Sequence, residues 1–423
     1  MELNTHLQEI QENLNRFIEN INCLRDTFGF SEGTLVQQVK DAEKEYNDFI
    51  RTFNRNIKTN ELDVPLKFYR DYLKRLKQKR RAERASVLIP PSYLISLVSS
   101  YDLFYAELIR IIYRIIPEKL LENEKSFTYR DLSTYKSVQE VRTLIIEETI
   151  EGLLRDSHIK QFEWLEKAMG VQTLKRFDEW PIFVELTERR NLFVHSDGMV
   201  SQQYIDVCSN HDALTDEVRK GAQLKVDKDY FLKAYNTLYI VGIKLTQMLA
   251  HTIYDKQFPN DHSSIDFILI NNVYELISEE LYDIAISVSH FALNNKHFKH
   301  NGNDRGYIIL NLAQAYKWKG QNEKCIEILK QEDCTAWRDE LLIPKFTLEG
   351  KYDTVYEKMK NVGRGSDILT PENYRQWPIF KEIRKEDDFI NLFHFIFGED
   401  LSITLPIKTD ENQDESEQTL LIG

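Results

Sequence analysis

Residues 188–198, ERRNLFVHSDG, hold the side chains of this chain that are best suited to chemistry. On a helix, Asn191 and His195 lie four residues apart and share one face. Arg190 precedes Asn191, and its long side chain reaches the same place. An imidazole can take the proton of a ribose 2′-hydroxyl near neutral pH, and a guanidinium can hold phosphate oxygens as charge builds on them. Because the attacking oxygen would come from RNA itself, we expect neither a metal nor a cofactor.

The same residues also permit a structural interpretation. Glu185 and Glu188 stand within one or two helical turns, so they could pair with Arg189 or Arg190 in a surface network. His195 could bond a carbonyl near the end of its helix. The catalytic and the structural interpretations both stay open at this point.

A helical bundle is predicted to position these residues. Pro90-Pro91 followed by Ser92 predicts a boundary, because proline restricts the residue before it and serine caps helices. A helix from Ser92 to about Ile116 carries a broad apolar stripe of the kind that belongs in a core. Gly198 predicts that the motif's helix ends near His195. Further helices are predicted at 137–155, at 158–169, at 174–196 (or only after Trp180, given Pro181), near Ser201 to Val207, and from Asp227 to about Tyr254.

Residues 90–256 resemble the HEPN superfamily. The resemblance rests on VSSYDLFYAELIRIIYRIIPEKL (98–120), on the RN-x3-H core formed by Arg190, Asn191 and His195, and on VHSDGMVSQQYI (194–205). It implies that Arg190 and His195 are the catalytic pair of a metal-independent endoribonuclease, with Asn191 as the polar supporter. It also implies a homodimer and a role as a toxin or antiviral-defence effector. Many members of this superfamily act as binding modules instead, so a non-catalytic scaffold that binds a protein partner is the alternative.

The N-terminal segment, residues 1–89, is predicted to form a helical hairpin and a basic linker helix. Leu3, Leu7, Ile10, Leu14, Phe17, Ile21, Leu24 and Phe28 repeat by four and three, which predicts a helix with one apolar seam. Gly29 and Gly33 predict a break before a second helix from Thr34 to Ile57. Either the two helices fold back on the body, or the seam forms an intermolecular coiled coil.

Residues 67–86, KFYRDYLKRLKQKRRAERAS, carry a concentration of basic side chains, with only Asp71 and Glu83 as acids. One interpretation is a contact for RNA phosphates, and the other is a solvated linker helix. The RNA-binding candidates are Lys74, Arg75, Lys79, Arg80 and Arg81.

The C-terminal part, residues 260–404, is predicted to be an array of helical repeats. Residues 311–329, with Gly320 at a tight turn, resemble a tetratricopeptide unit, and 346–359 resemble a weaker copy around Gly350. A degenerate pair is predicted at 273–297. Such repeats offer surfaces for a protein partner. The tail, residues 405–423, is predicted to be acidic and disordered.

Composition limits the remaining possibilities. The chain has 423 residues with few glycines and prolines, which favours an all-α fold. Its net charge of −13 makes it a poor general binder of polyanions, so any RNA contact must be local. None of the four cysteines has zinc-ligand spacing. Neither a signal peptide nor a membrane span is expected, and we expect a cytoplasmic protein.

Overall fold

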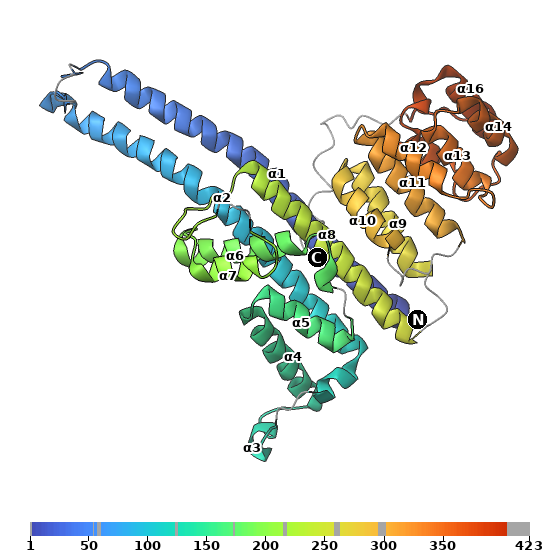
Figure 1. The fold of residues 1–423 in the computed structure, drawn as a ribbon, viewed down its shortest axis with the longest axis horizontal. Coiled ribbons are helices and arrows are strands. Elements are labelled where there is room, and N and C mark those ends of the chain that lie inside the picture. Colours follow the sequence, from blue (N-terminus) through green and yellow to red (C-terminus); the bar gives the residue numbers. More distant parts are fainter. Residues whose placement is uncertain are drawn as a thin grey trace, which may run out of the picture. The chain divides into compact units, whose positions relative to one another are not determined.

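The computed structural model describes residues 2–53, 55–56, 61–122, 126–171, 174–214, 218–257, 263–294 and 302–403 (Figure 1). These residues are almost entirely helical, which confirms the all-α prediction. The chain divides into two compact units, Met1–Ile265 and Asp266–Gly423. The Arg190–His195 motif belongs to the first unit.

A single long helix, α1 (Glu2–Ile50), opens the first unit. The predicted break after Phe28 is wrong, because Gly29 and Gly33 stay within the helix. A glycine in a helix interior costs about 1 kcal/mol, and the packing of α1 against two other long helices, α2 and α8, outweighs that cost. The two helices predicted at 1–28 and 34–57 are therefore one helix as far as Ile50.

The antiparallel partner of α1 is α2 (Leu66–Ile115), and Figure 1 shows the two helices side by side. Two short strands, β1 (Arg55–Asn56) and β2 (Glu61–Leu62), pair near the turn between them. Tyr46 on α1 lies beside Tyr72 on α2, with ring centroids 6.1 Å apart. The hairpin therefore exists, but it joins α1 to α2.

The predicted boundary at Pro90-Pro91 is also wrong, since both prolines lie inside α2. Proline has no N–H group, so each leaves the carbonyl four residues earlier without its helical hydrogen bond. Those carbonyls belong to Ser86 and Val87, on a part of α2 that solvent reaches. The border drawn between residues 89 and 90 thus falls within one continuous helix.

The heptad seam of α1 packs inside the first unit. Phe17 stacks on Phe104 of α2 with ring centroids 4.8 Å apart, and Phe28 stacks on Phe231 of α8 (Lys228–Gln257) at 3.9 Å. The described seam residues other than Leu24 are buried. The seam is thus occupied within the chain, which favours the folded-back arrangement over a coiled coil between chains.

The helices predicted for the rest of the first unit lie close to their predicted positions. Asp227 caps α8 by accepting a hydrogen bond from the Tyr230 N–H, as its place before the helix predicts. The other elements are η1 (Pro117–Glu122), α3 (Tyr129–Leu132), α4 (Val138–Arg155), α5 (His158–Met169), η2 (Leu174–Arg176), α6 (Trp180–Ser196) and α7 (Gln202–Ser209).

The second unit contains successive helical hairpins. Gly320 and Gly350 both have left-handed backbones at the expected turns, with φ of 83° and 71°. After each glycine, the next N–H bonds the carbonyl five residues back, and Leu281 does the same after Glu280. The elements are α9 (Ser263–Ser278), α10 (Tyr282–Asn294), α11 (Gly302–Trp318), α12 (Asn322–Gln331), α13 (Asp339–Leu348), α14 (Tyr352–Val362), α15 (Pro371–Gln376), η3 (Pro378–Phe380), η4 (Ile383–Lys385) and α16 (Asp387–Phe397).

Two further predictions concern the tail and the membrane. The acidic segment Lys408–Glu417 lies outside the described residues. Within the described residues, only α2 has the length and hydropathy of a membrane-crossing helix, and the core helix of a soluble protein can have both as well.

Candidate functional site

Helix α6 carries the motif and ends where the sequence predicts. Asp197 and Gly198 leave the helix with left-handed backbones, with φ of 48° and 79°. A Cβ atom at Gly198 would lie 2.5 Å from Cε1 of Phe193, so the turn requires glycine. The Leu224 N–H bonds the Gly198 carbonyl at 3.0 Å, which fixes the turn to the chain before α8.

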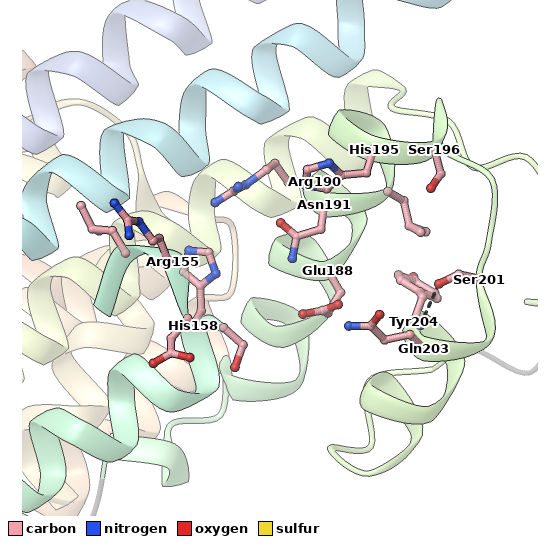
Figure 2. Close-up of a pocket in the computed structure, with 14 residues that line it drawn as sticks. Arg155, His158, Glu188, Arg190, Asn191, His195, Ser196, Ser201, Gln203 and Tyr204 are labelled. Carbon is pink, nitrogen blue, oxygen red and sulfur yellow. Dashed lines mark hydrogen bonds between the residues drawn. The ribbon is translucent and has the colours of Figure 1, made fainter. Parts of the chain in front are cut away.

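Arg190, Asn191 and His195 line one open pocket of about 520 Å³ between α5, α6 and α7. Figure 2 shows their side chains around this space with His158 on the neighbouring helix. The volume falls in the range of small-molecule sites. The other lining residues include Arg155, Asp156, Ser157, Glu188, Ser196, Ser201, Gln203 and Tyr204.

The guanidinium of Arg190 is held from outside its own helix. Its Nη2 donates to Oδ2 of Asp102 on α2, at 2.9 Å. The other carboxylate oxygen, Oδ1, lies 2.9 Å from Nε2 of His158. One carboxylate thus joins α2, α5 and α6. Nε of Arg190 is buried and has no hydrogen-bond partner among the described residues, so a ligand would have to meet the N–H donors of the two Nη groups that Asp102 does not use.

His158 is the first residue of α5 and is almost completely buried, with 5% of its surface exposed. Ser157 caps the helix by accepting a hydrogen bond from the Lys160 N–H. The ring packs beside Tyr101 and Phe183, with centroids 6.0 and 5.9 Å away. Packing and the Asp102 contact together fix the orientation of this imidazole at the pocket wall.

Glu188 adds a carboxyl group with an altered proton affinity. Only 8% of its surface is exposed, and this burial raises its pKa above the ordinary value of 4.5. The charges of His158 and Arg190 and a hydrogen bond from Asn191 oppose the rise without cancelling it. A buried carboxyl group beside a cation is therefore part of the pocket.

The neighbouring Glu185 belongs to a structural network. It accepts hydrogen bonds from Arg189 Nε at 2.6 Å, from the Tyr204 hydroxyl at 2.6 Å and from the Tyr230 hydroxyl at 2.7 Å. The Arg189 guanidinium also stacks 3.7 Å from the Tyr230 ring centroid. The Arg–Glu pairing considered for this motif therefore exists for Arg189, but it is largely buried and not a surface network, whereas Arg190 pairs with Asp102.

His195 differs from His158 in its solvent exposure. It is exposed in the last turn of α6, and it makes no hydrogen bond or ion pair with any described residue. Its ring is thus accessible from solvent. One pocket therefore presents an accessible imidazole, an anchored guanidinium, an amide and a buried carboxyl group, which is a set suited to proton transfer at an anionic substrate.

The structure separates the basic residues of α2 into two sets. Arg75 lies 3.6 Å from Glu45, and Lys79 lies 3.6 Å from Glu43, so both face α1. Lys74, Arg80 and Arg81 are exposed to solvent. Arg80 still interacts electrostatically with Tyr46 on α1, so Lys74 and Arg81 are the two of these five candidates that are placed to meet a large ligand without giving up a partner on α1.

Asp102 and His158 were not among the residues singled out from sequence. Asp102 and Glu107 are the two acids in the apolar stretch 92–116, and a carboxylate beside buried tyrosines is a weak signal for a partner. His158 follows a capping serine and shares no motif with Arg190. Asp102 lies 56 positions from His158 and 88 positions from Arg190 in the sequence, so the cluster could not be recognised before the structure was known.

Among the described residues, no three His, Cys, Asp or Glu side chains gather where a metal ion could be held. Comparisons of the chain with models of protein families, with curated proteins and with solved structures find no match.

Proposed function

We propose that the chain is a metal-independent endoribonuclease of the HEPN type. The observation that carries the proposal is that Arg190, Asn191 and His195 line one open, polar pocket. The resemblance of residues 90–256 to that superfamily names the same three residues. Burial of the set in a packed core would have argued against catalysis.

The geometry supports distinct roles for the three residues. His195 is exposed and unpaired among the described residues, so it is suited to take the 2′-hydroxyl proton. Arg190 is fixed by Asp102 and retains donors for the phosphate oxygens, where charge increases in the transition state. Asn191 lies between them and supplies an amide to the pocket. The 2′-oxygen would form a bond to phosphorus as the P–O5′ bond breaks. The departing 5′-oxygen would take a proton from water, which leaves a 2′,3′-cyclic phosphate and a 5′-hydroxyl as the products.

The wider proposal is a cytoplasmic toxin or antiviral-defence effector that acts as a homodimer. The hairpins of the second unit would bind a protein partner that senses or restrains the nuclease, because helical repeats present extended binding surfaces. Neither a cofactor nor a metal takes part.

The competing function is a non-catalytic scaffold. The ion pair between Arg190 and Asp102 favours it, because a structural arginine has such a partner without any ligand. The net charge of −13 favours it too. Growth on overexpression separates the two functions: a nuclease should be toxic only while Arg190 is intact, and a scaffold should be tolerated equally with Arg190→Ala.

The direct test is RNA cleavage by purified protein in EDTA. His195→Ala should lower the rate by about 10²- to 10⁴-fold, the usual contribution of a general base. His394→Ala is the matched control, because His394 is an exposed histidine on α16 in the second unit. Equal cleavage by the wild-type protein and His195→Ala would exclude this base.

A further inference from the structure

The distal part of the α1–α2 hairpin, which we call the arm, runs from Val36 to Ile50 on α1 and from Leu66 to Ser86 on α2 (Figure 1). Phe68, Tyr72, Arg75 and Lys79 mark the side of α2 that faces α1. The opposite side of α2 has no partner among the described residues of the arm. The residue types on this side of α2 therefore indicate which kind of molecule it could bind.

Six cations occupy that opposite side at spacings of three and four residues. Each residue turns an α-helix by about 100°, so such spacings form one stripe along the helix. At about 1.5 Å per residue, the stripe is about 25 Å long. All six residues are exposed: Lys67, Arg70, Lys74, Lys77, Arg81 and Arg84.

The stripe contains no carboxylate. The two acids of this segment, Asp71 and Glu83, fall at other angles around the helix, and Glu83 lies 3.8 Å from Lys79 on the α1-facing side. A solvated helix surface normally mixes both signs of charge, as the far side of α1 does with Lys40, Asp41 and Lys44. In a chain of net charge −13, an unbroken cationic stripe indicates an anionic partner.

One end of the stripe lies at the motif. Arg84 Nη2 is 3.6 Å from Oδ2 of Asp197, the residue that ends α6 two positions after His195. A polyanion held along the stripe would therefore reach the C-terminal end of α6, where Asp197 lines a hollow beside α2 and His195 lines the motif's pocket. A lipid surface has no segment that could continue into a pocket, so this placement favours a nucleic acid.

We propose that the stripe binds the phosphate backbone of an extended RNA strand and guides it to the Arg190–His195 pocket. This inference rests on the proposed function and defines its substrate as a long RNA. Regularly spaced cations contact phosphates without reading bases, so the contact gives affinity and register with little sequence preference. Short oligonucleotides that fill only the pocket would lack this contribution.

The test measures binding apart from cleavage. The probe is a fluorescein-labelled, 2′-O-methylated 24-nucleotide RNA, which has no free 2′-hydroxyl for the reaction, compared with a four-nucleotide version. The stripe variant combines Lys74→Gln, Lys77→Gln and Arg81→Gln. Its matched control combines Lys40→Gln, Lys44→Gln and Arg51→Gln, which removes the same charge from two exposed positions on α1 and from the exposed residue that follows its last residue.

The expected result is a salt dependence that follows the number of phosphate contacts. Single strands lose about 0.7 in the slope of log K against log salt for each contact. The stripe variant should therefore have a slope smaller by about 2, and weaker binding of the 24-mer by about tenfold to a hundredfold near physiological salt. The control should bind as the wild type does, and neither variant should alter binding of the four-nucleotide probe.

Three outcomes decide the matter. Equal slopes for the stripe variant and the control would overturn the inference. Stripe-dependent binding to vesicles containing anionic lipid, with no binding to RNA, would also overturn it and assign the arm to a membrane surface. Stripe-dependent RNA binding by a wild-type protein that does not cleave RNA would support the stripe and refute the nuclease, so the two proposals fail separately.

Discussion

Asp102 and Arg190 lie 88 positions apart in the sequence, and their side chains meet at 2.9 Å across α2 and α6. The same carboxylate contacts His158 at 2.9 Å, so one side chain fixes both groups at the pocket wall. A contact that orients a cation and an imidazole together has consequences for stability as well as for chemistry.

Asp102→Asn should lower the free energy of unfolding by about 2 kcal/mol, the usual contribution of a hydrogen bond to a charged group. The change keeps the shape of the side chain but leaves the half-buried Arg190 without its counter-charge. Urea unfolding measures the effect. Glu151→Gln is the matched control, because the Glu151–Arg155 pair is exposed and should change stability by less than about 1 kcal/mol. Equal losses in the two variants would show that the Asp102 contact is not special.

Glu188 should make the protein less stable as pH rises, whereas an ion-paired carboxylate makes a protein more stable as pH rises. Its pKa is raised in the folded protein, so the folded state binds more protons than the unfolded state above the ordinary value of 4.5. Stability then falls as pH rises through that interval, and the penalty is complete above the folded pKa. Glu188→Gln removes the titration, so its stability relative to the wild type should increase as pH rises from the ordinary value of 4.5 through the raised pKa of the folded protein. Urea unfolding at several pH values checks this, and a difference that stays constant with pH would contradict it.

Gly242 on α8 should resist a single added methyl group. A Cβ atom there would lie 2.7 Å from Cε1 of Phe17, a ring already stacked on Phe104. Gly242→Ala should therefore destabilise the protein by about 1–3 kcal/mol through overpacking. Gly152 on α4 provides the control, because nothing lies within 4 Å of its Cβ position. Gly152→Ala should stabilise the helix by about 0.5–1 kcal/mol. Thermal unfolding of both variants tests the close approach of α1 and α8.

The cysteines should differ in reactivity. Burial raises the pKa of the Cys208 thiol to about 12 and that of Cys325 to about 11, whereas Cys23 is exposed. The thiolate is the reactive form, so Cys208 and Cys325 should stay unmodified in native protein while Cys23 reacts with iodoacetamide. Peptide mass spectrometry after labelling at about pH 8 measures this. Urea should expose all three thiols, and native labelling of Cys208 as fast as Cys23 would contradict its burial.

Local signals in the sequence predicted most of the helices near the site. Asp227 caps α8 and Gly198 follows the end of α6, because caps and left-handed turns depend on single residues. The predicted breaks at Gly29 and Pro90 failed for the opposite reason. Their cost is local, and the packing that outweighs it comes from distant helices.

Some residues of the candidate site could likewise be grouped from the sequence, and others only from the structure. Arg190, Asn191 and His195 share one short helical segment, so their grouping followed from helix geometry alone. Asp102 and His158 reach the pocket from α2 and α5, through contacts that no spacing rule describes. The direction of each cation on the arm also needed the structure, because the α1-facing side of α2 was known only once Glu43 and Glu45 were seen beside it.

The proposed homodimer predicts that two inactive variants restore activity to each other. If two motifs face one cleft, each cleft takes residues from both chains. Arg190→Ala and His195→Ala should each be inactive alone, and a mixture that is unfolded and refolded together should regain RNA cleavage. Each heterodimer then keeps one intact Arg190 and one intact His195. Light scattering at micromolar concentration should give a dimer mass for every sample. A dimer whose mixtures stay inactive would mean that each pocket acts within its own chain, and His158 would then be the second imidazole to test.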